Sequence, residues 1–148
     1  MNPKARSIVA TVLLALCLAA LVSRHELLAR HPAGLALQIA AVLLMIWARW
    51  TFGRRSFHAA ADPTQGGLVT VGPYRYWRHP IYAAVLILLW AGVLSQRAVP
   101  TGVALLLALM ATVFCFVRIQ AEELLLRRTF PAYDAYAART KRIIPFVA

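Results

Sequence analysis

The sequence of 148 residues has few acidic residues and little charge of any kind. Only 5 residues are Asp or Glu, and the four charged residue types together make up 14%. Soluble domains carry about a quarter charged residues, and disordered chains are poor in apolar ones. Apolar residues here reach 61%, with a mean hydropathy of +0.68. The composition therefore disfavours both classes and indicates an integral membrane protein of one domain.

Cysteine and metal-ligand motifs are also scarce. The two cysteines, Cys17 and Cys115, lie inside apolar stretches, as small core residues do. No C-x-x-C or H-E-x-x-H spacing occurs. The sequence therefore predicts neither a disulfide framework nor a metal site.

Four apolar stretches approach the roughly 20 residues that a membrane-crossing helix needs. They are 7–23, 33–48 (reaching residue 50 if Arg49 lies at the interface), 80–96 and 98–117. Arg97 and a few neighbours separate the last two, which predicts a tight antiparallel hairpin. We therefore expect an all-α membrane protein with four transmembrane helices.

The first stretch has features of a signal peptide, because Lys4 and Arg6 precede its apolar core. A Leu-Ala-Leu-Cys sequence ending at Cys17 also resembles a lipoprotein cleavage site. Such a site needs a small residue before the cysteine, and Leu16 is large. We therefore favour a retained span over a cleaved signal.

Basic residues are distributed unevenly between the two ends of these spans. Thirteen Lys and Arg residues fall on the amino tail, the second loop and the carboxyl tail, and three fall on the other two loops. The positive-inside rule then predicts cytoplasmic termini, in the inner (plasma) membrane. Topology and lipid phosphates account for the net charge of +11, so we expect membrane lipids and no nucleic acid as partners.

The chain is predicted to be a single membrane domain, 1–148, without an internal repeat. Residues 1–50 hold the first two spans, 51–79 form a cytoplasmic loop, and 80–148 hold the hairpin and the carboxyl tail. Tyr133 and Tyr136 share one face of an expected amphipathic helix on the cytoplasmic side. That helix either lies along the membrane surface or covers the site as a lid.

Polar side chains form two clusters on the cytoplasmic side, and the first precedes the third span. Pro80 is favoured at the first position of a helix, so His79 is its cap and Tyr82 lies on its first turn. Free N–H groups and the positive end of the helix dipole make this a site for a carboxylate or a phosphate. The neighbouring Arg75, Tyr76 and Trp77 suit interfacial anchoring better.

The second cluster follows the fourth span. A helix from Val99 to about Arg128 has roughly 30 residues and a length of about 45 Å, whereas the hydrocarbon core is about 30 Å thick. Its last turns must therefore project into the cytosol, where Arg118 and Glu122 share a face. An ordinary surface ion pair is the alternative. Because acidic residues are so scarce, we favour function for Arg118 and Glu122 and leave Glu123 open.

The hairpin brings the two clusters together, which predicts one pocket. A helix N-terminus suits an anion, carboxylates suit a cation, and aromatic walls suit a flat ring. S-adenosylmethionine has all three features, although a nucleotide phosphate would satisfy several of the same groups. Methyl transfer needs mainly positioning, and Arg118 suits an anionic acceptor.

At these residues the sequence resembles the isoprenylcysteine carboxyl methyltransferase family and the related phospholipid methyltransferases. The resemblance covers 66–145, and two ordered motifs flank the hairpin. They are Leu68-Val69-Thr70-Val71-Gly72-Pro73-Tyr74 with Arg78-His79-Pro80-Ile81-Tyr82, then Arg118-Ile119-Gln120-Ala121-Glu122-Glu123 followed by Leu126, Phe130, Tyr133, Tyr136, Arg142 and Pro145.

The resemblance implies a membrane enzyme that uses S-adenosylmethionine, with Arg118 at the acceptor. It implies that the cofactor contacts Gly66, Gly67, Leu68, Val69, Tyr74, His79, Pro80, Ile81, Tyr82 and Glu122. We add Glu123 to this set. Eukaryotic members have more spans before this core, so we expect a small lipid-like carboxylate, thiol or amine as acceptor rather than isoprenylcysteine in particular.

Two other readings remain open. NADPH-dependent sterol-type reductases share an Arg-His-Pro-x-Tyr segment but usually have Asn where this chain has Ile81. A non-enzymatic four-helix accessory protein would carry polar residues along its spans, and here only Gln38 and scattered Ser or Thr occur. The sequence leaves the acceptor, the oligomeric state and the pathway undetermined.

Overall fold

The structure is a computed structural model that describes residues 2–53, 67–96 and 100–143. These residues form the helices α1 (Pro3–Ser23), α2 (Pro32–Phe52), α3 (Pro80–Leu94), α4 (Gly102–Thr129) and α5 (Tyr133–Arg139), with the short 3₁₀ helix η2 (Gly72–Arg75) before α3. No strand occurs within these ranges, and one isolated parallel bridge joins Trp77 to Lys141. The predicted all-α class is confirmed.

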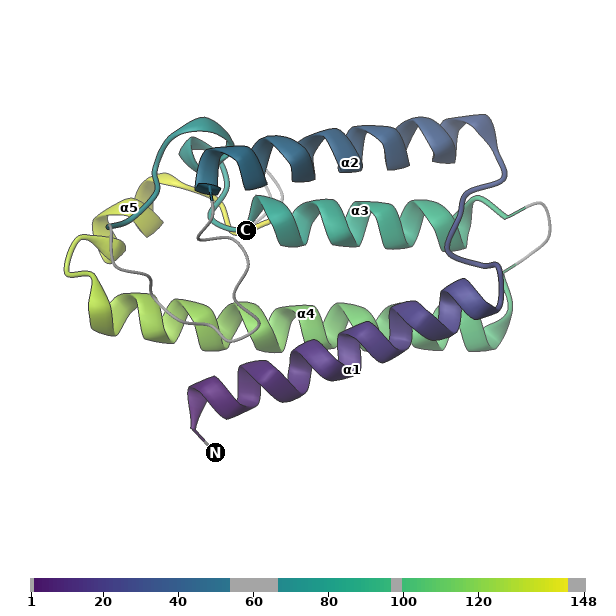
Figure 1. Ribbon diagram of the computed structural model, residues 1–148, viewed down its shortest axis with the longest axis horizontal. Coiled ribbons are helices and arrows are strands. Elements are labelled where there is room, and N and C mark those ends of the chain that lie inside the picture. Colours follow the sequence, from purple (N-terminus) through teal and green to yellow (C-terminus); the bar gives the residue numbers. More distant parts are fainter. Residues whose placement is uncertain (1, 54–66, 97–99, 144–148) are drawn as a thin grey trace.

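Figure 1 shows the four long helices side by side, with α5 and η2 at one end. The helix α1 packs most extensively against α4, and α2 packs against α3. Consecutive helices run in opposite directions, so the amino ends of α1 and α3 and the carboxyl ends of α2 and α4 lie at the same end as α5. That end is called the α5 end below.

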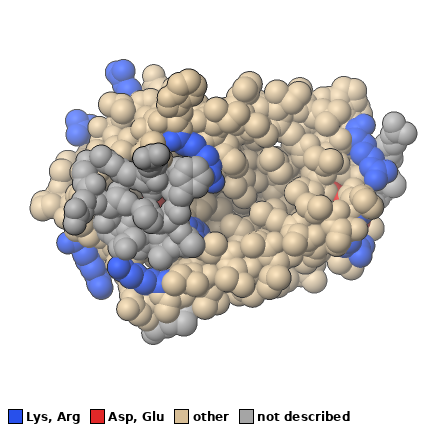
Figure 2. Space-filling view, viewed as in Figure 1, with Lys and Arg blue, Asp and Glu red and all other residues tan. Residues whose placement is uncertain are grey.

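Three of these helices, α1, α2 and α4, are long and apolar enough to cross a membrane. Lys and Arg gather at the two ends of the molecule, with an uncharged band between them (Figure 2). On α1, α2 and α4 respectively, Leu16, Leu43 and Leu106 are each more than half exposed. Apolar side chains on the outside of a helical bundle indicate a surface that faces lipid.

The predicted number of four spans is not confirmed, because three helices of the described residues are long and apolar enough to cross a membrane. The helix α3 is apolar but has 15 residues, or about 22 Å at 1.5 Å per residue. It is shorter than predicted because it ends at Leu94, with Ser95 as its cap. Its Pro80 start is as predicted.

Local capping explains where the other helices begin. Asn2 accepts a hydrogen bond from the Lys4 N–H, so α1 begins at Pro3, four residues before the apolar stretch. Thr101 caps α4 by accepting from the Ala104 N–H. The helix α4 therefore begins at Gly102, three residues later than predicted, and ends at Thr129, close to the prediction.

The core at the end far from α5 joins three helices. Small residues on α4 allow α1 to approach closely, as they do in membrane helix pairs. This cluster consists of Leu14, Cys17, Leu21, Leu89, Val93, Ala104, Ala108 and Ala111. A second cluster, Ala83, Cys115, Ile119 and Ile143, joins α3 and α4 near the α5 end. The helix α4 thus has α1 as its main partner, although α3 and α4 follow each other in the chain.

One polar side chain fixes α2 against α3. Gln38 Nε2 donates to the carbonyls of Leu27 (2.8 Å) and Leu88 (3.0 Å), and its Oε1 accepts from the Ala29 N–H (3.0 Å). Gly92 lies against the same loop, since an added Cβ would be 1.8 Å from the Leu27 oxygen. These contacts give the lone polar residue of the second span a structural role.

Candidate functional site

Polar side chains converge at the α5 end, where two distant segments pair through their backbones. The Arg78 N–H donates to the Lys141 carbonyl (2.7 Å), and the His79 N–H donates to the Arg142 carbonyl (3.1 Å). In return the Lys141 N–H donates to the Tyr76 carbonyl (3.0 Å). This pairing holds the carboxyl tail beside the start of α3.

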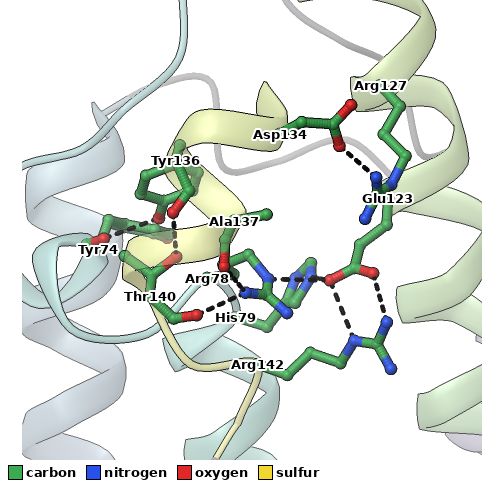
Figure 3. Close-up of polar contacts among 10 residues, drawn as sticks. All are labelled: Tyr74, Arg78, His79, Glu123, Arg127, Asp134, Tyr136, Ala137, Thr140 and Arg142. Atoms are coloured by element: carbon green, nitrogen blue, oxygen red, sulfur yellow. Dashed lines mark hydrogen bonds and ion pairs between the residues drawn. The ribbon is translucent and has the colours of Figure 1, made fainter. Parts of the chain in front are cut away.

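Glu123 lies at the centre of an ion cluster within this region (Figure 3). Its Oε1 is 3.1 Å from Arg78 Nε and 3.3 Å from His79 Nε2. Arg142 binds both carboxylate oxygens, at 3.2 Å from Nε and 2.9 Å from Nη2. The Glu123 side chain is only 6% exposed, and a carboxylate so buried requires such charged partners.

Arg78 also binds the end of α5 (Figure 3). Its Nη1 donates to the carbonyls of Ala137 (2.7 Å) and Thr140 (2.5 Å). The last carbonyls of a helix lack intrahelical partners, and a cation is favourable there. We call Arg78, His79, Glu123 and Arg142 the tail clamp, because together they join α3, α4 and the tail.

A second polar group lies one turn away along α3 and α4. The Tyr82 hydroxyl donates to Glu122 Oε2 at 2.8 Å and accepts from Arg118 Nε at 2.5 Å. The Arg118 guanidinium also lies over the Tyr82 ring, 5.8 Å from its centroid. Because arginine only donates and an ionised carboxylate only accepts, the hydrogen bonds run from Arg118 through Tyr82 to Glu122.

The helix α3 begins as predicted, but the His79 side chain does not cap it. His79 occupies the N-cap position and Pro80 follows, but the His79 side chain makes no capping hydrogen bond. The His79 ring instead turns toward Glu123 and is 3% exposed. It also makes an edge contact with the Tyr82 ring, at 5.6 Å between centroids. The His79 side chain therefore leaves the first-turn N–H groups of α3 without a cap of its own.

Three buried tyrosines pack around the tail clamp. The Tyr136 hydroxyl donates to the Tyr74 carbonyl at 2.7 Å (Figure 3), and the Tyr74 ring lies 5.4 Å from that of Phe52. Burial raises the pKa of Tyr136 to about 12 and raises the pKa values of Tyr74 and Tyr133 as well. All three phenols are therefore neutral near neutral pH.

Two buried polar atoms near this region stand out. Within the described residues, the Tyr133 hydroxyl and the Trp77 Nε1 are buried and have no hydrogen-bond partner. Burial of a polar group without a partner is costly. Tyr133 is only 1% exposed, and the Arg127 guanidinium lies 5.6 Å from its ring centroid. Arg127 in turn pairs with Asp134.

The structure brings together several of the predicted site residues at the start of α3 and on α4. His79, Pro80, Ile81 and Tyr82 open α3, beside Arg118, Glu122 and Glu123 on α4. Tyr74 lies in η2, joined to α5 through Tyr136. Gly67 has a positive φ of 82° and is exposed, Leu68 and Val69 are half-buried, and Gly66 lies outside the described residues.

Other residues of this region were absent from the predicted set. Arg78 and Arg142 fall within the quoted motifs. The position of Arg78 beside His79 and that of Arg142 in the basic tail were the sequence features that could have marked them as site residues. Thr11 hydrogen-bonds to Arg118 from α1, and nothing in its sequence context marks it. No group of three or more His, Cys, Asp or Glu that suits a metal occurs in the described part of the chain.

The fold and the site define a helical membrane protein whose polar residues converge at one end. The phospholipid methyltransferase family matches residues 29–132, and the chain belongs to this family. The predicted relationship to membrane methyltransferases is thereby confirmed.

Two curated relatives are similar to part of the chain. The nickel-cobalt-cadmium resistance protein NccN of Alcaligenes xylosoxydans xylosoxydans is 36% identical over 81 residues, which cover 53% of this chain and 36% of that protein. The cobalt-zinc-cadmium resistance protein CzcN of Cupriavidus metallidurans is 38% identical over 80 residues, or 53% and 35% of the two chains. The match thus spans about a third of each relative's length. No solved structure matches the chain.

Proposed function

We propose that the protein is an S-adenosylmethionine-dependent methyltransferase that acts on a small lipid-like acceptor at the cytoplasmic face of the inner membrane. Membership of the phospholipid methyltransferase family supports methyl transfer in a membrane. The observation that carries the proposal is the series Arg118–Tyr82–Glu122, in which one hydroxyl joins a cation to a carboxylate.

The residues of the α5 end fit the charges of S-adenosylmethionine. Glu122 is half-buried and suits the ammonium or the adjacent sulfonium. The start of α3, which the His79 side chain does not cap, suits the carboxylate. Trp77 Nε1 is a buried donor that has no partner among the described residues, which suits an acceptor atom of a bound ligand. The remaining proposed contacts are Gly66, Gly67, Leu68, Val69, Tyr74, His79, Pro80, Ile81 and Tyr82.

Bound S-adenosylmethionine supplies an electrophilic methyl group on a sulfonium. The protein's contribution is then mainly to position two reactants and exclude water. Tyr82 fixes the orientation of the Glu122 carboxylate by donating to it. Arg118 is one helical turn before Glu122 on the same face, where it suits the head group of an anionic acceptor.

Glu123 has a different proposed role from its neighbour. Both of its carboxylate oxygens accept hydrogen bonds from arginines of the tail clamp, Arg78 and Arg142. We therefore assign Glu123 to positioning rather than to direct contact with the cofactor. It holds the His79 ring and keeps the tail over the start of α3.

The acceptor is proposed to reach the site from the bilayer. The face drawn in Figure 2 is hollowed near its middle, between the α2–α3 pair and the α1–α4 pair. The surface around this hollow is uncharged except toward the α5 end, where Lys or Arg atoms border it, and its uncharged part suits an acyl or prenyl chain. The excess of Lys and Arg on the tails and the second loop supports a cytoplasmic location for the α5 end.

The test is methyl transfer by the purified protein in lipid nanodiscs, with S-adenosylmethionine labelled in its methyl group. Dodecanoate, dodecanethiol and dodecylamine share one chain and differ only in the head group. We expect label in one of the three products and a preference for the carboxylate. Reduction of a sterol by NADPH, with no transfer of label to any acceptor, would overturn the proposal.

A further inference from the structure

The guanidinium of Arg118 is held by helices on two sides. Its Nε donates to the Tyr82 hydroxyl of α3 at 2.5 Å. Its Nη1 donates to the Thr11 hydroxyl of α1. Arg118 itself lies on α4, so three helices meet at this one side chain.

The Thr11 hydroxyl can act only as an acceptor toward Arg118. It has a single hydrogen, which it donates to the Ser7 carbonyl one turn earlier in α1 at 2.8 Å. Its lone pairs are then available to the guanidinium, which only donates. The direction of both hydrogen bonds is therefore fixed, and the Thr11 side chain is held in one rotamer.

Two hydrogen bonds to different nitrogens define the plane of a guanidinium better than one. The added contact to Thr11 fixes the second nitrogen, and both partners are neutral hydroxyls. Such a group is pre-organised for the planar, two-point recognition of a carboxylate.

We infer that Thr11 is a positioning residue for Arg118, so that α1 completes the acceptor site. This inference rests on the proposed function, in which Arg118 orients the acceptor. The family match begins at residue 29 and so does not include α1. The contribution of α1 is thus a property of this chain that the family relationship does not assign.

The first test is structural and does not depend on activity. The ¹⁵N–¹H resonance of Arg118 Nε, assigned by its loss in Arg118→Lys, reports the environment of the guanidinium. We expect it to shift in Thr11→Val, which removes the hydroxyl at nearly constant shape, and to stay close to wild type in Thr11→Ser. An unchanged resonance in Thr11→Val would overturn the inference whether or not the protein transfers methyl groups.

A matched control is present on α4. Thr112 donates to the Ala108 carbonyl at 2.8 Å and accepts from Trp90 Nε1 at 3.1 Å, which is the same arrangement as at Thr11 with a different donor. Thr112→Val should lower thermal stability and leave the Arg118 resonance unchanged. If Thr11→Val and Thr112→Val shift the Arg118 resonance equally, the shift reports a general change in helix packing, and the inference fails.

The second test is kinetic, with dodecanoate as acceptor. Loss of a hydrogen bond to a charged group corresponds to about a tenfold change, so we expect KM for dodecanoate to rise about tenfold in Thr11→Val. The Kd for S-adenosylhomocysteine should stay unchanged, and Thr11→Ser should restore KM. An unchanged KM, or an equal loss of cofactor affinity, contradicts positioning of the acceptor by Thr11. Absence of any methyl transfer by the wild type would instead contradict the proposed function.

Where Thr11→Val does not fold, Thr11→Ala removes the same hydroxyl without a branched side chain. Its expected results are the same in both tests. Thermal unfolding of each variant in detergent shows which variants are folded and can be compared with the wild type.

Discussion

The Tyr82 hydroxyl lies 2.8 Å from Glu122 Oε2 and donates to it, joining the first turn of α3 to the part of α4 at the α5 end. The two residues are 40 positions apart in the sequence. The same oxygen accepts from Arg118, so one phenol links the proposed cofactor carboxylate to the proposed acceptor arginine.

Replacing Tyr82 with Phe should therefore impair both proposed contacts at once. It leaves the Glu122 carboxylate and the Arg118 guanidinium without their common partner, and hydrogen bonds to charged groups contribute about 1.5–3 kcal/mol. We expect about a tenfold or larger loss in the ratio kcat/KM. Tyr76→Phe is the control, because Tyr76 is 55% exposed, and it should retain wild-type kinetics. Equal activity of the two variants would remove Tyr82 from the site.

Replacing Glu123 with Gln should destabilise the fold more than it affects chemistry. The change removes the negative charge that faces Arg78, His79 and Arg142. Breaking a buried ion pair by removing one partner costs about 3–5 kcal/mol, which thermal unfolding in detergent would detect. The control is Asp134→Asn, since the Asp134 side chain is 71% exposed and should contribute less than about 1 kcal/mol. If the two variants unfold at the same temperature, the tail clamp does not stabilise the fold.

The two tyrosines of α5 should respond differently to loss of their hydroxyls. Tyr136→Phe leaves the buried Tyr74 carbonyl without its donor and should cost about 1–2 kcal/mol in the free energy of unfolding. Tyr133→Phe removes a hydroxyl that has no partner in the described ranges, so it should be neutral or slightly stabilising. The reverse order in denaturation experiments would contradict the hydrogen bonding described for this helix.

Alkaline pH should weaken the fold through the same residues. The pKa of Tyr136 rises from 10.0 to about 12 on burial, so above pH 10 the unfolded chain loses its proton before the folded one. The stabilisation is complete below the unfolded pKa and is lost as pH rises from about 10 through 12. The thermal unfolding midpoint of the wild type should fall as the pH is raised from 8 to 11, and that of Tyr136→Phe should fall less. An identical decline in the variant would show that this phenol does not contribute.

The sequence predicts the all-α class and the positions of the long helices, because apolar length and helix caps are local properties. Pro80 marks the start of α3, and an apolar run marks the body of α4. The exact end of α3 at Leu94 was not predicted, because an apolar stretch that reaches Gln96 does not reveal where the helix stops.

The partners of adjacent residues were harder to predict. Glu122 and Glu123 differ by about 100° around a helix of 3.6 residues per turn, so each faces a different neighbour. Glu122 contacts Tyr82, and Glu123 contacts His79. Which carboxylate meets which partner depends on the rotation of α4, and the contact of Thr11 with Arg118 depends on how α1 crosses α4. Neither is encoded in a local motif.

The most direct test of the account is calorimetric titration of the protein in nanodiscs with S-adenosylhomocysteine. We expect one site per chain in the wild type and at least about a tenfold weaker Kd in Glu122→Gln, from loss of a charge-assisted contact. Glu26→Gln changes a carboxylate at the other end of the bundle, where it pairs with Arg24 at 2.9 Å, and should bind as the wild type does. No binding by the wild type, or equal affinity in Glu122→Gln and the wild type, would contradict a cofactor site at this carboxylate.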